Sequence, residues 1–252
     1  MSIYDSAFYL HRDAKTRYAA ETVLSCVREL LPEINSAVDI GCGVGTWLSV
    51  LSDWGINTIQ GVDGQWVETA QLVIPETAFK ALDFSELNSF MLSRSFDLAI
   101  CLEVAEHITA DRAAEFVGAL TELSDVILFS AAIPGQDGIG HVNEQWPEYW
   151  VRLFSDHDYH VYDFIRPRIW EDENIPWWYR QNILLFAGQK SQRDISSRLS
   201  QAHNLKSFGA SSIVHPSLVH QLNYKISQLD NLTFISALKL LFRGDRYRRS
   251  IS

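Results

Sequence analysis

A glycine loop that follows an apolar run is the feature of the chain whose residue types and spacing most directly indicate chemistry. The stretch AVDIGCGVGTW, residues 37–47, places Gly41, Gly43 and Gly45 two residues apart. Glycine lacks a Cβ and tolerates positive φ, so such a loop lets the backbone approach a ligand closely. Asp39 adds a carboxylate at the end of the apolar run. The pattern predicts a cofactor loop beside a negative charge.

The spacing distinguishes two classes of cofactor. Dinucleotide loops follow G-x-G-x-x-G, in which the third glycine lets the helix pack close to the strand. Thr46 occupies that third position here, and Gly45 gives G-x-G-x-G instead. Asp39 would suit an ammonium group and would sit badly beside a pyrophosphate. The loop therefore favours a cofactor with an ammonium group, and an NAD-dependent oxidoreductase is the alternative.

The elements around the loop predict an α/β fold with a doubly wound sheet. Strands and helices that alternate along a chain imply a mostly parallel sheet with helices on both faces. We expect seven strands, the last two pairing antiparallel, and ligands beyond the carboxyl ends of the strands. Strand patterns occupy 36–40, 57–63, 78–84, 96–104, 125–133, 159–167 and 181–188, and helical patterns occupy 13–31, 46–55, 110–123 and 146–158.

Several motifs resemble those of one superfamily. VDIGCGVGTW resembles the first motif of the class I, Rossmann-like methyltransferases, which use S-adenosylmethionine (SAM). GVDG, with Asp63, and ALDF, with Asp83, fall where that superfamily carries acids after its second and third strands. EVAEH, residues 103–107, resembles a later motif, nearest to small-molecule methyltransferases of the ubiquinone-biosynthesis type. The resemblance extends from about Ser36 to Ala187.

The resemblance implies a set of residues that bind SAM. Asp63 would accept both ribose hydroxyls, which is a bidentate, charge-assisted contact. Asp83 would meet the adenine amino group, with Phe84 stacking nearby. Taken singly, Asp63 is also typical of a turn and Asp83 of a helix N-cap. The implied cofactor residues are Asp39, Gly41, Cys42, Gly43, Asp63, Gly64, Asp83, Phe84 and Glu103.

Two histidines are the candidates for a catalytic base. Transfer of a methyl group to a hydroxyl requires removal of the hydroxyl proton, and histidine suits that task near neutral pH. Only His107 and His141 fall in loops at the predicted cofactor edge. We rank His141 first, with Glu144 orienting it, and His107 second. The alternatives are that His107 braces the next helix or touches the cofactor and that His141 holds its own loop.

The loops at 131–146 and 164–180 carry the candidate substrate residues. Eleven aromatic residues lie between Trp146 and Tyr179, which favours an apolar wall or lid. Trp150 and Phe154, on a predicted helix, are more typical of the core. Three arginines, Arg166, Arg168 and Arg180, could hold a phosphate or carboxylate group. They could equally pair with the acids at 171–173, which are Glu171, Asp172 and Glu173. The predicted substrate residues are Trp146, Arg168, Trp170, Trp177 and Arg180.

Charge is distributed unevenly along the chain, whose net charge is −10. Residues after Gly188 carry ten Lys and Arg against three Asp and Glu, so the preceding body is strongly acidic. An acidic body argues against nucleic-acid partners, which need clustered cations. Cys26, Cys42 and Cys101 lack metal-like spacing and predict buried, reduced thiols in a cytoplasmic protein. We predict no metal site.

Composition predicts three parts: a SAM-binding domain at 1–188, a polar linker at 189–215 and a basic helical tail at 216–252. The tail could bind a membrane surface, in which case the protein would be peripheral at the inner membrane. The alternative is packing on the acidic body or on a second subunit of a homodimer.

The predicted function is a SAM-dependent methyltransferase, with oxygen as the expected acceptor atom. The expected acceptor is a hydroxyl of a sugar, a glycan precursor or a secondary metabolite. A SAM-fold protein that only binds or scaffolds is a further alternative. No feature of the sequence names the acceptor.

Overall fold

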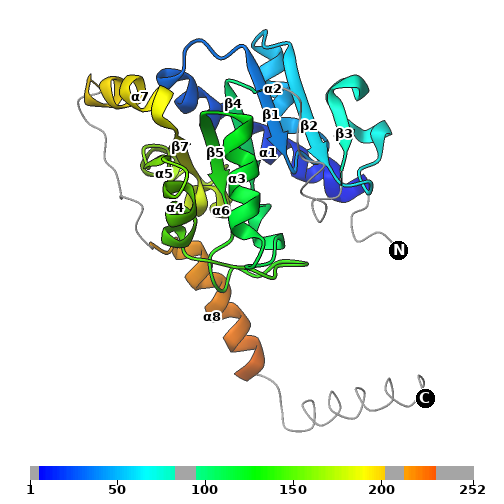
Figure 1. Ribbon diagram of the computed structural model, residues 1–252. Helices are drawn as coiled ribbons and strands as arrows, with labels where there is room; N and C mark the ends of the chain where they lie inside the picture. Colours follow the sequence, from blue (N-terminus) through cyan, green and yellow to red (C-terminus); the bar gives the residue numbers. More distant parts are fainter. Residues whose placement is uncertain (1–5, 83–94, 202–212, 231–252) are drawn as a thin grey trace. The chain divides into compact units, whose positions relative to one another are not determined.

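The computed structural model describes residues 6–82, 95–201 and 213–230. The chain divides into two compact units, Met1–Ile213 and Val214–Ser252, and each is described by itself. Figure 1 shows the first unit as a sheet between helices.

Seven strands form one sheet in the order β3-β2-β1-β4-β5-β7-β6. The strands are β1 (Ser36–Ile40), β2 (Thr58–Asp63), β3 (Phe79–Ala81), β4 (Leu98–Leu102), β5 (Val126–Ser130), β6 (His160–Tyr162) and β7 (Leu184–Ala187).

The strands from β3 to β5 are parallel, and β7 runs antiparallel to both β5 and β6. This confirms the predicted mostly parallel sheet and its antiparallel last pair. Strand β1 lies between β2 and β4, and Asp39 is in register with Gly61 on one side and Ile100 on the other. The strand order reverses at this point, and in open α/β sheets ligands bind beyond the carboxyl ends of the strands at such a reversal.

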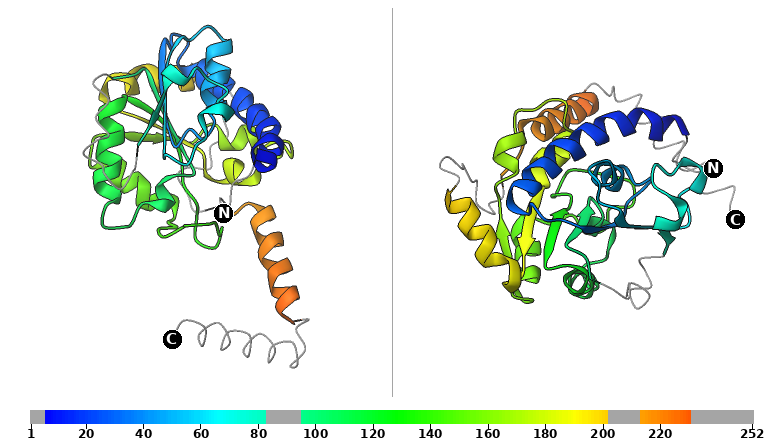
Figure 2. Two further views of the ribbon diagram at one scale, coloured as in Figure 1. Left: turned by 90° about the vertical axis from the view of Figure 1, so that its right-hand side faces the viewer. Right: turned by 90° about the horizontal axis from the view of Figure 1, so that it is seen from above.

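Helices cover both faces of the sheet (Figure 2). One face packs against α1 (Ser6–Leu30) and α2 (Thr46–Asp53), and the other against α3 (Ala113–Leu123) and α4 (Pro147–Ser155). Strand β4 serves both layers because side chains alternate along a strand. Leu98 and Ile100 join the first apolar cluster, whereas Ala99 and Cys101 join the second. Cys26, Cys42 and Cys101 are all buried and free, as expected.

The segment predicted as a loop at 164–180 contains two short helices. Proline marks the start of each, because its fixed φ suits a first helical turn. Pro167 lies in the first turn of α5 (Arg166–Ile169), and Pro176 is the N-cap of α6 (Trp177–Asn182). The remaining short turns are the 3₁₀ helices η1 (Thr69–Gln71), η2 (Glu76–Ala78) and η4 (Ala105–His107).

The polar segment at 189–215 contains helix α7 (Gln189–Gln201), which contacts α1 and β7. In the second unit, Pro216–Asp230 form α8. The rest of the predicted tail, 231–252, lies outside the described residues. Within the described ranges, none of the helices has both the length and the apolar character that crossing a bilayer requires.

Candidate active site

The glycine loop leaves β1 in a conformation that only glycine adopts easily. Gly41, Gly43 and Gly45 have φ of 81°, 54° and 91°. A Cβ at Gly41 would lie 2.2 Å from Cγ2 of Val104, so that glycine is also needed for packing. A Cβ at Gly43 would meet no protein atom within 4 Å. The loop is thus packed on one side and open at Gly43, which fits close approach by a ligand.

Asp63, at the end of β2, fixes this loop. Its Oδ2 accepts a hydrogen bond of 2.7 Å from the backbone N–H of Gly43, and its Oδ1 accepts one of 2.6 Å from that of Gly64. Burial raises the pKa of Asp63, while these two hydrogen bonds oppose the rise. The carboxylate therefore lies beside the open part of the loop and orients it.

Asp39 is a buried acid under the loop. Its Oδ2 has no hydrogen-bond partner. Burial, and then the charge of Asp63, raises the pKa of Asp39 well above its usual range. A buried carboxyl without a partner is costly. A cationic group at this strand end would therefore be stabilised by Asp39, which agrees with the ammonium group expected from the sequence.

Glu103 follows β4 and sits at the centre of a polar network. Its φ of 57° is unusual for a residue with a side chain and marks strain of the kind that gathers at functional sites. Its Oε2 accepts a 2.6 Å hydrogen bond from Gln136, and its Oε1 accepts a 3.1 Å bond from Asn182. Asn182 also donates to Oε1 of Gln136 at 2.8 Å. Burial raises the pKa of Glu103, and these donors oppose the rise.

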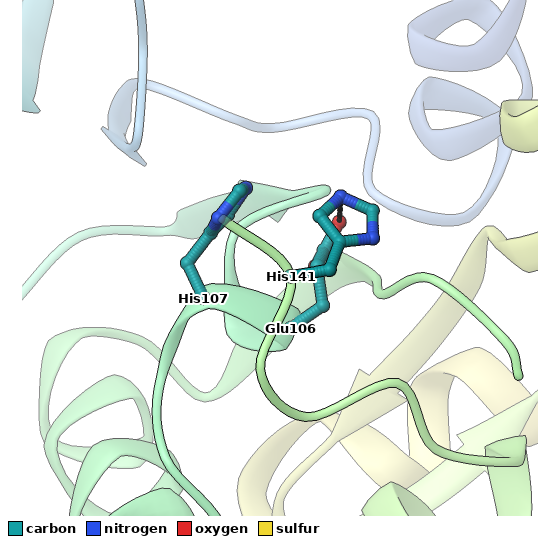
Figure 3. Close-up of side chains that lie close together, drawn as sticks. All are labelled: Glu106, His107 and His141. Carbon is teal, nitrogen blue, oxygen red and sulfur yellow. Dashed lines mark ion pairs between the residues drawn. The ribbon is translucent and has the colours of Figure 1, made fainter. Parts of the chain in front are cut away.

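The loop after β5 places His141 against η4. The backbone carbonyl of Glu106 accepts hydrogen bonds from the N–H groups of Val142 and Asn143, at 2.9 and 3.0 Å. These two bonds bring together segments that are distant in sequence. The rings of His107 and His141 meet edge to face, with centroids 5.0 Å apart (Figure 3).

Hydrogen bonds determine which nitrogen of each ring carries the proton. Nδ1 of His107 lies 3.1 Å from the carbonyl oxygen of Gly140, and Nδ1 of His141 lies 2.9 Å from Oε1 of Glu144. A carbonyl and a carboxylate only accept, so each Nδ1 is the donor. In the neutral rings Nε2 then keeps a free lone pair. Burial lowers the pKa of His107, and the neighbouring His141 lowers it further, which favours the neutral form.

Glu106 lies beside these rings. Its Oε1 is 3.8 Å from Nε2 of His141, and its side chain is 1% exposed. Neither of its carboxyl oxygens has a hydrogen-bond partner. Burial, and then the charge of Glu103, raises the pKa of Glu106 to about 9. The site therefore combines two imidazoles, each with its Nδ1 nitrogen hydrogen-bonded, and a buried acid whose pKa is raised.

Comparisons with known proteins identify the family of the chain. A family model described as a methyltransferase domain matches residues 9–167. The chain belongs to that family. It is a class I SAM-dependent methyltransferase. No protein with a curated description matches it in sequence.

Solved structures share the fold of this methyltransferase. The sugar N-methyltransferase KedS8 from Streptoalloteichus sp. ATCC 53650 is 18% identical with a TM-score of 0.56, and the match covers 75% of this chain and 96% of that one. An O-methyltransferase family protein from Burkholderia thailandensis is 13% identical with a TM-score of 0.51, covering 73% and 60%. DesVI from Streptomyces venezuelae is 13% identical with a TM-score of 0.50, covering 72% and 95%.

The cofactor of the methyltransferase is SAM, as its family membership shows, and the NAD-dependent alternative loses its support. The glycine loop, Asp39, Asp63 and Gly64 lie at the sheet edge where the cofactor was expected, and Glu103 lies at the end of the neighbouring strand. Asp83 and Phe84 fall outside the described residues. Their roles, and the nearness to the ubiquinone type, stay predictions.

The predicted substrate residues of the methyltransferase occupy different surroundings. Arg168 forms a 3.0 Å ion pair with Glu29 on α1, and Arg180 donates to the carbonyl of Trp170 at 2.9 Å. Trp146 is the N-cap of α4 and is 39% exposed, while Trp177 stacks edge to face on its neighbour Trp178. Their roles toward an acceptor stay predictions.

Arg166 forms an ion pair in the interior of the protein. It is fully buried and makes a two-point contact with Asp163, at 2.9 and 2.7 Å. It also donates to the carbonyl of Gln181 at 3.2 Å. The sequence left open whether Arg166 holds an anionic ligand or pairs with an acid. The structure shows that it pairs with an acid, Asp163.

Sequence reasoning missed four residues at the site. Glu106, Gln136 and Asn182 are buried polar side chains that meet Glu103 or the histidines only in the fold. Trp66 is 62% exposed and lies against Gly64, directly after Asp63. A large aromatic three residues past an expected cofactor acid was the available signal for Trp66. No local pattern marks Gln136 or Asn182.

Proposed function

We propose that this methyltransferase moves a methyl group from SAM to a hydroxyl of a small molecule, namely a sugar, a glycan precursor or a secondary metabolite. The observation that carries the proposal is the pair of imidazoles at the cofactor edge. Their Nδ1–H groups are engaged, so Nε2 of each is left to accept a proton. Such an acceptor is what a hydroxyl nucleophile needs.

Bound SAM supplies a methyl group on a sulfonium, which carries its own leaving group. The protein must then hold the acceptor in line and remove its proton. Nε2 of His141 takes the proton, and Glu144 stabilises the imidazolium through Nδ1–H. A base of this kind contributes roughly 10²–10⁴-fold. Orientation of the two reactants contributes further rate.

The loop around the cluster gives the acceptor site its character. Ile139 and Val142 are exposed large apolar residues on that loop, and Trp146 follows them. Such side chains cover the apolar faces of a sugar or a ring without making a charged contact. A neutral, polyhydroxylated or aromatic acceptor suits this surface better than an anionic polymer.

The experiment is a search for the labelled product. The purified protein is incubated with SAM labelled in its methyl group and with fractionated small-molecule extracts, and the labelled product is identified by mass and fragmentation. A methyl ether supports the proposal. A methylated amine would replace hydroxyl transfer by nitrogen transfer. SAM binding without any labelled product in small-molecule, RNA or protein fractions would favour a non-catalytic role.

A further inference from the structure

The side chains of Glu106, His107 and His141 form a cluster of possible metal ligands. Each offers a ligand atom, and these atoms lie within 4.8 Å of one another (Figure 3). Glu106 and His107 belong to η4, and His141 belongs to the loop after β5. The backbone bonds from Val142 and Asn143 to Glu106 fix the two segments together. The cluster is therefore held by the fold before any ligand binds.

Both imidazoles are oriented as metal ligands are. A ring that binds a metal through one nitrogen usually donates its other N–H to a carboxylate or a backbone carbonyl, which fixes its tautomer. His141 donates to the carboxylate of Glu144, and His107 donates to the carbonyl of Gly140. Two rings of one cluster thus show the outer contacts that prepare Nε2 to bind a cation.

Glu106 supplies a second, independent observation. Its side chain is 1% exposed, yet neither oxygen finds a hydrogen-bond donor. A buried acid of this kind is stable when it is protonated, paired with a charge or bound to a metal ion. Nε2 of His141 lies 3.8 Å from Oε1 of Glu106 and carries a lone pair in the neutral tautomer. A cation bound between the oxygen of Glu106 and the two nitrogens would displace the proton that Glu106 otherwise holds, as metal binding to a protonated ligand does.

In place of the absence of a metal site predicted from the sequence, we propose that Glu106, His107 and His141 bind one divalent transition-metal ion. Two imidazoles and a carboxylate are the ligands preferred by ions such as Mn²⁺, Fe²⁺ and Zn²⁺, whereas Mg²⁺ and Ca²⁺ prefer oxygen alone. Bonds of about 2.1 Å in a tetrahedral arrangement set two ligand atoms about 3.4 Å apart. The pair Glu106–His141 is 3.8 Å apart and all three ligand atoms lie within 4.8 Å of one another, so binding would draw each pair of ligand atoms closer together. Three protein ligands leave a position open for the acceptor.

The consequence for catalysis rests on the proposed function. An acceptor hydroxyl bound at the open position loses its proton more easily, because the cation stabilises the alkoxide. The O–H proton passes to solvent, the oxygen forms a bond with the methyl carbon, and the S–CH₃ bond breaks with its electron pair left on sulfur. With the cation bound, His141 is a ligand, and it no longer acts as the base.

The test measures metal binding without any acceptor. The full chain is stripped with a chelator, and Mn²⁺ and Zn²⁺ are added in calorimetry, with Mn²⁺ also followed by its electron paramagnetic resonance. We expect one ion per chain, and weaker binding of Mg²⁺ and Ca²⁺. SAM affinity is measured on every sample, so that a misfolded variant is recognised.

Substitutions distinguish the metal ligands from residues that do not bind the metal. Glu106→Gln, His107→Ala and His141→Ala should each weaken Mn²⁺ binding by more than about 100-fold, beyond the range expected for an outer contact. Glu144→Gln should weaken it by about 10–100-fold. His160→Ala, on an exposed residue of β6, should change nothing. SAM affinity should stay within a factor of about two to three throughout, since Asp63 and the glycine loop are intact.

Wild-type protein that binds neither Mn²⁺ nor Zn²⁺ at millimolar concentration would overturn the proposal. So would one-to-one binding that all three ligand substitutions leave unchanged. If the proposed function fails and the metal site is correct, metal binding would still respond to the substitutions as expected, but no hydroxyl acceptor would be methylated.

Discussion

At the scale of single residues, Asp63 holds the glycine loop, and we predict that it also binds the ribose hydroxyls of SAM. It accepts backbone hydrogen bonds from Gly43 and Gly64. We expect Asp63→Ala to weaken SAM binding by about 1.5–3 kcal/mol, because a charged acceptor is lost. Calorimetry with SAM measures the change.

A companion substitution separates the two roles of Asp63. Asp63→Asn keeps one carbonyl oxygen for the loop and loses the charge. It should therefore retain more thermal stability than Asp63→Ala while still weakening SAM binding. Undiminished SAM affinity in both variants would remove Asp63 from the cofactor site.

His141 is the second residue whose role can be isolated. We expect His141→Ala to cut turnover at least about tenfold, as loss of a base or of a metal ligand would. SAM affinity should stay nearly unchanged, because the contacts of the ring are with His107, Glu106 and Glu144. Single-turnover kinetics with saturating SAM measure the effect.

The same measurement on His107→Ala ranks the two histidines. Full turnover in His141→Ala together with lost turnover in His107→Ala would reverse their roles. Full turnover in both variants would mean that the rate comes from positioning alone.

At the scale of elements, the loop after β5 positions His141 through a glycine. A Cβ at Gly138 would lie 2.0 Å from Nε2 of His141, so an alanine there must displace the ring. We expect Gly138→Ala to lower turnover about as much as loss of His141 does. Thermal stability should change little, because Gly138 is exposed. Turnover and melting temperature are measured on the same preparation.

Gly118→Ala is the matched control. Its new Cβ would meet only the exposed ring of His157, at 3.2 Å, and alanine favours a helix interior. Turnover should not change. If Gly138→Ala is as active as this control, then displacement of the His141 ring does not affect turnover.

At the scale of the whole molecule, the buried acids set how stability depends on pH. The pKa of Asp39 is raised in the fold by burial and by Asp63, so the folded chain holds a proton that the unfolded chain releases near pH 4. Stability from this group is complete below that pH and is lost as pH rises toward the folded pKa. We expect ligand-free protein to melt at lower temperature as pH rises above about 4.

Asp39→Asn tests the origin of that trend. It removes the titrating group, so the melting temperature should fall less steeply with pH than in the wild type. Asp111→Asn, at an exposed residue, should leave the slope unchanged. Equal slopes in all three proteins would exclude Asp39 as the cause. SAM binding by Asp39→Asn should weaken, because the ammonium group of SAM would no longer face a carboxylate.

The second unit gives a further prediction. Residues 214–252 form their own compact unit, so deleting 216–252 should leave SAM affinity unchanged. Calorimetry on the shortened chain checks this. If the basic segment binds membranes, the full chain should bind anionic vesicles in a salt-sensitive way and the shortened chain should not. Full-length protein that ignores such vesicles at low salt would favour packing on the acidic body or a second subunit.

The order of strands and helices, the glycine loop and Asp63 were predictable from the sequence. Each rests on residues close together in the chain: alternation of apolar segments fixes strands, and glycine spacing fixes the loop. The ends of elements were less predictable. The strand expected at 78–84 is described only over Phe79–Ala81, and 164–180 contains helices.

Contacts between distant segments were decided only by the tertiary structure. Asn182 donates to Glu103 because α6, which directly precedes β7, lies at the sheet edge where β4 ends. His141 lies beside Glu106 because two backbone hydrogen bonds join their segments. Arg166 finds its acid at Asp163 and not among residues 171–173. Spacing along a chain cannot give these pairings, because they depend on which strand ends are neighbours in the sheet. The sequence therefore determined which chemistry the protein carries, and the fold determined which side chains share it.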